Sequence, residues 1–249
     1  MLTLELLLAL QEGQPSDSLD GPLAAEADRL VSALPGRPRM RVLHNISHHR
    51  DSAIAAGEPL ERLDGFVETG LVPHSTKVQI TSFDAALEVS VPDSVGPERM
   101  IEAARGLSTR LGNVIAPERS AVALGNDYSI MEGNGPVQLL VCLRRVPSLT
   151  HEEFCDFWLN ELVKHTKQTP GKCAYRQVHA NPELSALAAS AAGVLIDDVD
   201  GVALEFYPSL PLLYSAVDWA DRPNAAVIQA ETKMIDFGRG AILAYAPSA

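Results

Sequence analysis

The sequence predicts an α+β fold made of two ferredoxin-like halves, each in the order strand, helix, strand, strand, helix, strand. Three observations support it. Apolar runs of strand length alternate with helical segments in both halves, a turn-rich stretch (Glu-Gly-Asn-Gly-Pro) occupies residues 132–136, and Arg-Val-Leu-His-Asn at 41–45 aligns with Arg-Gln-Val-His-Ala at 176–180. We therefore place one domain at 1–133 and a second at 136–249. Each βαββαβ unit forms a four-stranded antiparallel sheet, and the two apolar sheet faces are expected to cover each other.

The first half contains four predicted strands and two predicted helices. The helix before the second strand carries a stripe of Ala, Leu and Val, and Asp20 is a candidate for its N-cap. Gly112 is a suitable C-terminal cap for the helix before the last strand. The predicted strands are 2–10, 40–46, 78–91 (with a turn near Asp84) and 121–130, and the helices are 23–34 and 97–111.

The second half begins with a continuous apolar strand at 137–143. Thr150 and Glu153 have the spacing of a capping box, so we expect a helix to begin there and to continue to about residue 167. The remaining predicted elements are a strand at 173–180, a polar loop up to the acidic stretch 197–200, a strand at 202–207, a helix at 210–233 broken near 222–223, and a strand at 241–246.

Composition restricts the class of partner. The chain has 20 Lys and Arg against 32 Asp and Glu, a net charge of −12, which disfavours nucleic acid and anionic membranes. Three cysteines without a C-x-x-C pair do not form a disulfide framework. The first apolar run lacks a basic flank and is too short to cross a bilayer. These features predict a cytoplasmic protein.

The strand at 173–180 carries the main candidate site. Tyr175, Gln177 and His179 share one sheet face because side chains on a strand alternate. We interpret this row as a pocket wall in which Tyr175 and Gln177 bind substrate and His179 is the general acid or base, since the pKa of imidazole lies near neutrality. The alternative is a hydrogen-bonded structural histidine.

Three further residues are candidates. Trp158 and His165 lie at helical spacing on one face of the preceding helix, so His165 is a second catalytic candidate. Trp158 either binds substrate or is a residue of the core. For His165 the alternative is an exposed side chain near a helix C-terminus. His44 shares a strand face with Met40 and Val42, and it either binds substrate at a second site or is a buried structural histidine.

The sequence predicts no metal site. His44, His48 and His49 resemble a ligand set, but residues four apart on a strand are about 13 Å apart, too far for one zinc ion. Asp197, Asp198 and Asp200 are expected in a solvated turn, and the direction of Glu205 stays open. The motifs G-x-S-x-G, Walker A, G-x-G-x-x-G and H-E-x-x-H do not occur in the sequence.

Residues 137–161 (VQLLVCLRRVPSLTHEEFCDFWLNE), Pro170 and 175–179 (YRQVH) resemble the EthD family, as do 200–203 (DGVA) and 233–237 (KMIDF). The resemblance covers about 110 residues, the whole second half. It implies an intrachain dimeric α+β barrel with a pocket between sheet and helices and no organic cofactor. The family's helix usually has a histidine four residues after the tryptophan, where this chain has Leu162.

The resemblance implies catabolism or tailoring of a hydrophobic small molecule. The first hypothesis is a cofactor-independent lyase, cyclase or isomerase that uses His179, with or without His165, on an aromatic or polyketide-like compound. The alternatives are a non-catalytic protein that binds a hydrophobic ligand, which the loss of the family histidine at Leu162 favours, and a cofactor-free oxygenase. Both a monomer and a homodimer are compatible with two halves in one chain.

Overall fold

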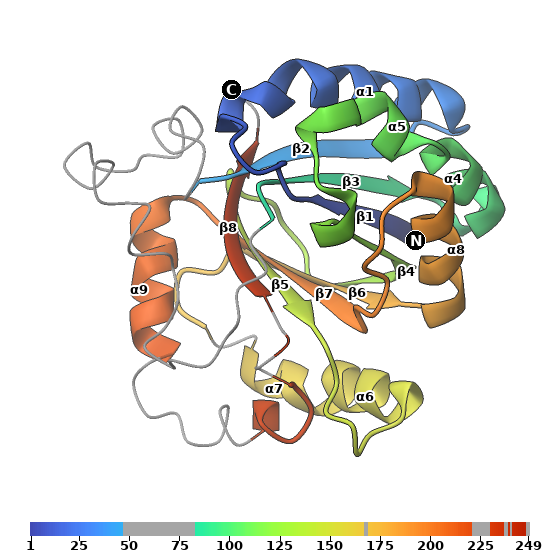
Figure 1. Ribbon diagram of the computed structural model, residues 1–249. Coiled ribbons are helices and arrows are strands. Elements are labelled where there is room, and N and C mark those ends of the chain that lie inside the picture. Colours follow the sequence, from blue (N-terminus) through green and yellow to red (C-terminus); the bar gives the residue numbers. More distant parts are fainter. Residues whose placement is uncertain (47–82, 167–168, 221–229, 237–238, 240, 248–249) are drawn as a thin grey trace.

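A closed barrel of eight antiparallel strands forms the centre of the molecule (Figure 1). The computed structural model describes residues 1–46, 83–166, 169–220, 230–236, 239 and 241–247. The barrel order is β1-β3-β2-β8-β5-β7-β6-β4. The α+β class and the barrel predicted from the sequence are therefore confirmed.

Two sets of four strands make up the barrel. The strands are β1 (Leu2–Leu8), β2 (Arg39–Asn45), β3 (Ala85–Val91), β4 (Ala121–Met131), β5 (Val137–Leu143), β6 (Ala174–Ala180), β7 (Gly201–Tyr207) and β8 (Ala241–Pro247). The order β4-β1-β3-β2 in the first set matches β8-β5-β7-β6 in the second, and the β2–β8 and β4–β6 pairs join the sets. The division of the chain into two domains between residues 133 and 136 stays a prediction.

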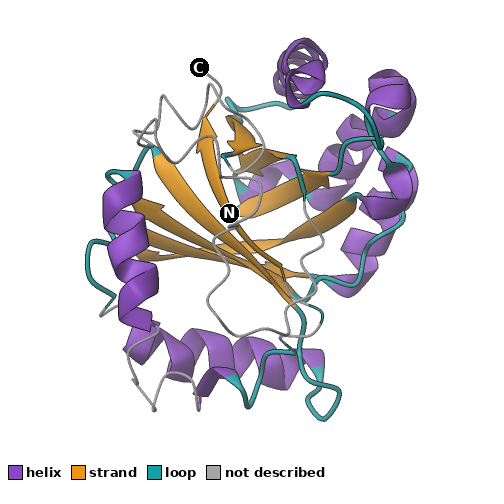
Figure 2. Ribbon diagram, turned by 60° about the vertical axis from the view of Figure 1, so that its left-hand side comes forward, coloured by secondary structure: helices purple, strands orange, loops and turns teal. Residues whose placement is uncertain are grey.

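Helices surround the barrel on its outer side (Figure 2). They are α1 (Asp20–Ala33), α4 (Pro97–Ala104), α5 (Leu107–Leu111), α6 (His151–Phe157), the π-helical turn η5 (Trp158–Leu162), α7 (Val163–Thr166), α8 (Pro182–Ala192) and α9 (Leu210–Ala220). Short 3-10 turns are η1 (Ser16–Leu19), η2 (Asp93–Val95), η3 (Gly112–Val114) and η4 (Pro117–Arg119). Among the described residues, no helix combines the length and apolarity that a bilayer span needs.

Local signals in the sequence placed most of these elements. Thr150 and Glu153 form the predicted capping box, and Gly112 ends α5 with φ +58°. Two local predictions were wrong. Asp20 is the first residue of α1 and not its N-cap, which is Leu19, and the predicted helix 97–111 is broken at Gly106, whose φ is +70°. The predicted stretches 78–82 and 221–229 lie outside the described residues.

The loop predicted after β6 is wrong, because helix α8 occupies most of it. The Asn-Pro pair at 181–182 suggested a loop. Instead, Asn181 caps the helix, since the Leu184 N–H donates to Asn181 Oδ1 at 3.0 Å, and Pro182 occupies the first turn. The helix packs against α4 and β4 (Figure 1). The β6–β7 connection therefore covers the sheet made by residues 1–131.

The barrel interior is apolar at one end and charged at the other. The apolar end is a cluster of buried residues that includes Leu7, Leu43, Leu140, Val178 and Tyr245. At the other end lie the buried polar residues Thr3, Glu5, Glu88, Ser90, Gln138 and Arg176. The sequence predicts two apolar sheet faces that cover each other, and this charged end of the interior shows that the prediction was wrong for part of the barrel.

Arg176 is the centre of the charged end. Its Nη1 lies 2.6 Å from Glu88 Oε1, its Nε lies 3.1 Å from Asp127 Oδ1, and its Nη2 contacts the other oxygen of Asp127. Glu5 has no hydrogen-bond partner for either carboxylate oxygen among the described residues. Burial, and then the charge of Glu88, raises the pKa of Glu5 well above its usual value, which favours the neutral form of this carboxyl.

Gly125 allows the close approach of β4 and β6. A Cβ atom added at Gly125 would lie 1.8 Å from the backbone oxygen of His179, and backbone cannot move aside as a flexible side chain can. We expect Gly125→Ala to lower the free energy of unfolding by at least about 1–3 kcal/mol, the usual cost of overpacking. Urea denaturation measures this.

Gly21→Ala is the matched control for this prediction. Gly21 lies in α1, and a Cβ atom there would meet nothing within 4 Å. Alanine is favoured over glycine in a helix by about 0.5–1 kcal/mol, so this variant should be neutral or slightly stabilised. Equal stability of the two variants would contradict the role assigned to Gly125.

Candidate functional site

The row predicted on β6 lies beneath the helical layer formed by α6 and η5. The indole of Trp158 stacks on the imidazole of His179, with ring centroids 4.6 Å apart and planes inclined by 7°. Tyr128 from β4 approaches the same imidazole at 4.7 Å between centroids, tilted by 59°. The structure thus brings together four of the residues selected from the sequence: Trp158, Tyr175, Gln177 and His179.

A chain of hydrogen bonds fixes these side chains. Trp158 Nε1 donates to Tyr175 Oη at 3.1 Å, and Gln177 Nε2 donates to the same oxygen at 3.0 Å. His179 Nε2 lies 2.9 Å from Gln177 Oε1. Because an amide oxygen only accepts, Nε2 carries the proton of a neutral His179, and Nδ1 is left as the acceptor nitrogen.

Gly201 makes room for the indole on the sheet. A Cβ atom at Gly201 would lie 2.4 Å from Cζ3 of Trp158 and 3.0 Å from its Cη2. Gly201 pairs with His179 in the β6–β7 register. The missing side chain therefore lets Trp158 lie close against the sheet, stacked on the imidazole.

His179 is neutral under ordinary conditions. Its side chain is buried, and burial, followed by the charge of His151, lowers its pKa to about 4. Above about pH 5 the imidazole therefore keeps the lone pair on Nδ1 free to accept a proton. The charge that lowers the pKa of His179 is that of His151 on α6. The contact from β4 is the uncharged ring of Tyr128.

The depressed pKa of His179 predicts a dependence of stability on pH. Between pH 6.5 and pH 4 the unfolded chain binds a proton at this residue that the folded chain does not bind, so stability falls as the pH falls. The slope from this group is at most about 1.4 kcal/mol per pH unit. Urea denaturation of wild type and His179→Gln across this range should show the steeper loss in wild type, and parallel curves would contradict it.

Charged residues that the sequence analysis did not select continue the row beyond Tyr175. Lys172 Nζ lies 2.6 Å from Glu205 Oε1 and 4.8 Å from the centre of the Tyr175 ring. Tyr207 Oη donates to Glu205 Oε2 at 2.7 Å. Burial, and then the charge of Glu205, raises the pKa of Glu231 to about 7.

The register of the sheet explains this cluster. Glu205 on β7 pairs with Tyr175 on β6, so its carboxylate extends the polar row on the same outer face. The direction of the Glu205 side chain does not follow from the sequence, because alternation within one strand does not say which face is buried. Lys172 and Glu231 carried no signal at all, since neither lies within a strand.

The other two predicted histidines are placed differently. His44 is buried on the part of the barrel covered by α1, and its Nε2 lies 3.7 Å from Asp20 Oδ1, so it belongs to another region than His179. The backbone of His165 lies in α7, but its side chain lies outside the described part of the structure. The π-turn η5 inserts an extra residue, so the α-helical spacing that related His165 to Trp158 is not kept.

No metal centre is formed by the described residues, since they contain no group of three or more His, Cys, Asp or Glu side chains able to hold an ion. His48 and His49 lie outside the described residues.

The acidic turn at residues 197–200 was predicted to be solvated, and for Asp200 this prediction was wrong. Asp200 is buried, and it accepts a bond from the Arg145 N–H at 2.9 Å and an ion pair from the same residue's guanidinium.

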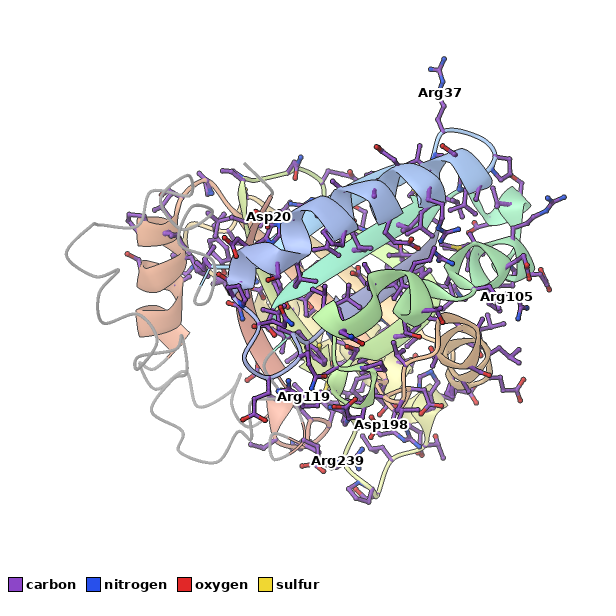
Figure 3. The ribbon with its side chains drawn as sticks, turned by 45° about the horizontal axis from the view of Figure 1, so that its top comes forward. Asp20, Arg37, Arg105, Arg119, Asp198 and Arg239 are labelled. Atoms are coloured by element: carbon purple, nitrogen blue, oxygen red, sulfur yellow. The ribbon has the colours of Figure 1, made fainter. Side chains whose placement is uncertain are left out.

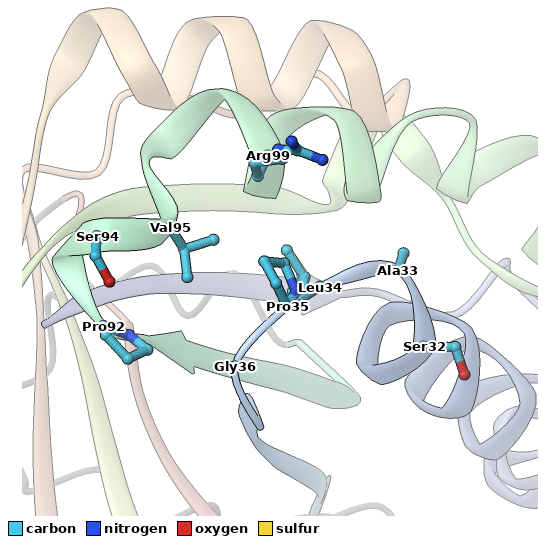
Figure 4. A pocket seen from close by; sticks show the side chains of 9 residues that line it. All are labelled: Ser32, Ala33, Leu34, Pro35, Gly36, Pro92, Ser94, Val95 and Arg99. Atoms are coloured by element: carbon cyan, nitrogen blue, oxygen red, sulfur yellow. The ribbon is translucent and has the colours of Figure 1, made fainter.

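Two of the surface hollows that the described residues line have volumes of about 560 and 600 Å³. One of about 560 Å³ is lined by residues that include Arg145, Pro182, Asp198, Asp200 and Arg239. Asp198 and Arg239 form an ion pair of 3.2 Å and lie in the same region of the molecule (Figure 3). The other, of about 600 Å³, lies between the end of α1 and the start of α4. Its lining has one charged residue, Arg99, and none of the predicted site residues (Figure 4).

Comparison with known proteins supports the fold. No protein-family model matches this chain, and no curated protein matches its sequence. An anthrone oxidase-like protein of known structure is 10% identical with a TM-score of 0.59, over 100% of this chain and 91% of that one. A dye-decolorizing peroxidase from Bacteroides thetaiotaomicron is 10% identical with a TM-score of 0.53, over 98% and 92%. The chain therefore has the dimeric α+β barrel fold, while the EthD family itself is not confirmed.

Proposed function

We propose that this chain is a cofactor-independent enzyme in which Nδ1 of His179 removes a proton from a hydrophobic aromatic molecule. The observation that carries the proposal is the fixed, neutral imidazole. Its Nε2 is bound by Gln177, its ring is stacked on Trp158, and its pKa of about 4 keeps Nδ1 unprotonated at neutral pH. A general base needs both a defined position and a free lone pair.

The strength of this base restricts the substrate. An imidazole with a pKa near 4 is a weak base, so it suits a proton that is already acidic, such as a phenol or a carbon acid beside a carbonyl. Tyr128, which is 37% exposed, offers an aromatic surface next to the imidazole. Aromatic and polyketide-like molecules contain both acidic protons and planar rings, and we propose this class as the substrate.

The fate of the resulting anion separates two reactions. Elimination or ring closure makes the protein a lyase or cyclase, which the resemblance of residues 137–161 to the EthD family favours. Reaction with dioxygen makes it an oxygenase, and the structural likeness to an anthrone oxidase-like protein favours this second candidate. Both begin with the same proton transfer to His179, so the proton transfer is tested first.

Anthrone is a suitable first probe because its methylene protons are acidic. The purified protein, dialysed against a chelator, is incubated with anthrone in deuterated buffer under nitrogen, and mass spectrometry follows the uptake of deuterium. We expect wild type to accelerate exchange above the rate in buffer, and His179→Ala to lose about 100-fold or more of that acceleration. Leu195→Ala, whose side chain is 71% exposed, is the control and should exchange as wild type does.

The outcomes of this experiment distinguish an oxygenase, a lyase and a protein that only binds the ligand. Exchange followed by oxygen consumption in air supports the oxygenase, and exchange with an eliminated or cyclised product supports the lyase. Anthrone that raises the melting temperature without any exchange supports a protein that only binds the ligand, as Leu162 at the family's histidine position suggests. Equal exchange by wild type and His179→Ala overturns the role of His179.

A further inference from the structure

Cys155, His151 and Asp200 form a second constellation of reactive side chains beside the first site. On α6, Cys155 Sγ lies 3.4 Å from Nε2 of His151, one helical turn earlier. The other ring nitrogen, Nδ1 of His151, lies 3.1 Å from Oδ1 of Asp200. The sulfur thus contacts the imidazole, and the imidazole contacts the carboxylate. This is the order of groups that activates a cysteine nucleophile.

Asp200 is held firmly in this arrangement. It is 4% exposed, its Oδ2 accepts the Arg145 N–H at 2.9 Å, and its Oδ1 receives the guanidinium of Arg145 as well as the His151 ring. The bond to Asp200, and then the contact with Cys155, raises the pKa of His151 to about 9. His151 is therefore a cation at neutral pH, and its positive charge lies beside the Cys155 sulfur, 3.4 Å away.

The three cysteines of the chain differ in environment. Cys155 is partly buried and lies against an apolar cluster that includes Trp158 and Phe154. Cys142 is fully buried, and burial raises its pKa to about 12. Cys173 is partly buried like Cys155, but its thiol contacts the backbone oxygens of Asn134 and Phe206, and burial raises its pKa.

We propose that Cys155, His151 and Asp200 form a thiol-addition site at which the Cys155 sulfur adds to an apolar α,β-unsaturated carbonyl compound. The Cys155 proton leaves to water, the sulfur lone pair forms a bond to the β-carbon, and the electron pair of the C=C bond moves to the α-carbon. The cationic His151 gives its Nε2 proton to the α-carbon and regains a proton from water, so that S–H is added across the double bond. Because this addition has no leaving group and consumes no oxidant, the side chains present and water supply every group that it requires.

The site is independent of the proposed proton transfer at His179. His151 acts on His179 only through its charge, which is the second cause of the low pKa of His179. Cys155 has no part in the chain of bonds that joins Trp158, Gln177 and His179. Failure of one proposal therefore leaves the other standing, and Cys155→Ser separates them.

The test uses N-ethylmaleimide, an α,β-unsaturated carbonyl compound, on the native protein between pH 6 and pH 8. Peptide mapping by mass spectrometry gives the rate at each cysteine. We expect Cys155 to react at least tenfold faster than Cys173 at pH 6, and its rate to fall less between pH 8 and pH 6, because a thiolate is the reacting form. Cys142 should react only after unfolding, when all three rates become similar.

His151→Asn is the decisive variant, since His151 is partly exposed at the start of α6 and we expect its replacement to leave the fold intact. It should slow Cys155 at pH 6 by about tenfold and leave Cys173 unchanged, while Asp200→Asn should act in the same direction. A Cys155 that reacts as slowly as Cys173, or a rate and pH profile that His151→Asn does not change, overturns the proposal.

Discussion

Replacing Arg176 by methionine is expected to lower the free energy of unfolding by about 3–5 kcal/mol, because removal of one partner leaves the others buried and charged. Arg176 is 8% exposed as a side chain and binds Glu88, which is fully buried, together with Asp127, which is 4% exposed. Methionine fills a similar volume but gives these carboxylates no cation. Urea denaturation at pH 7 measures the loss.

Arg39→Met is the matched control. Arg39 approaches the same carboxylates, at 3.7 Å from Glu88 and 3.4 Å from Asp127, but its side chain is 47% exposed. An exposed ion pair contributes about 0–1 kcal/mol, so this variant should lose little. If Arg176→Met costs no more than Arg39→Met, the buried network does not have the role assigned to it. A triple variant that adds Glu88→Gln and Asp127→Asn to Arg176→Met should recover part of the stability.

Trp158→Ala is expected to have two large effects at once. Trp158 is 1% exposed, and truncation of such a ring costs about 3–5 kcal/mol through lost burial and the cavity left behind. The same change opens the imidazole of His179 to water. Since burial is the main cause that depresses the pKa of His179 to about 4, this pKa should rise toward 6.5. NMR titration of the histidine ring protons measures the shift.

Trp158→Phe gives the graded comparison for this prediction. Phenylalanine keeps a flat ring above Gly201 and over His179, but it cannot donate to Tyr175 as the indole nitrogen does. We expect a smaller loss of stability and a smaller rise in the pKa of His179. A pKa that stays near 4 in the alanine variant would show that the indole is not what excludes water from the imidazole.

The sequence was sufficient to find the row Tyr175, Gln177 and His179. Alternation along a strand is a local property, and it placed these side chains on one face before any contact was known. The capping box at Thr150 was local in the same way. The charged extension of the row was not predicted, because Glu205 joins Tyr175 only through the pairing of β6 with β7.

Two features of the fold were not predicted from local sequence patterns. An Asn-Pro pair such as Asn181 and Pro182 is typical both of a turn and of the start of a helix. The helix forms because α8 packs on β4 and α4, which lie far away in the sequence. The π-turn at Trp158–Leu162 inserts one residue into an otherwise regular pattern, so the face assigned to His165 could not be read from an α-helical period.

The sequence by itself determined the order of the strands, the matching arginine and histidine positions 41 and 44 and 176 and 179, and the outer face of β6. These follow from periods of 2 and 3.6 residues and from capping chemistry, which act within a few residues of chain. Tertiary structure alone decided that Arg41 and Arg176 meet Glu88 inside the barrel, that Trp158 lies on His179, and that Asp200 joins His151, which lies one helical turn from Cys155. Such contacts join residues far apart in sequence, and they form only because closing the barrel forces particular side chains into a shared interior or beneath the same helix.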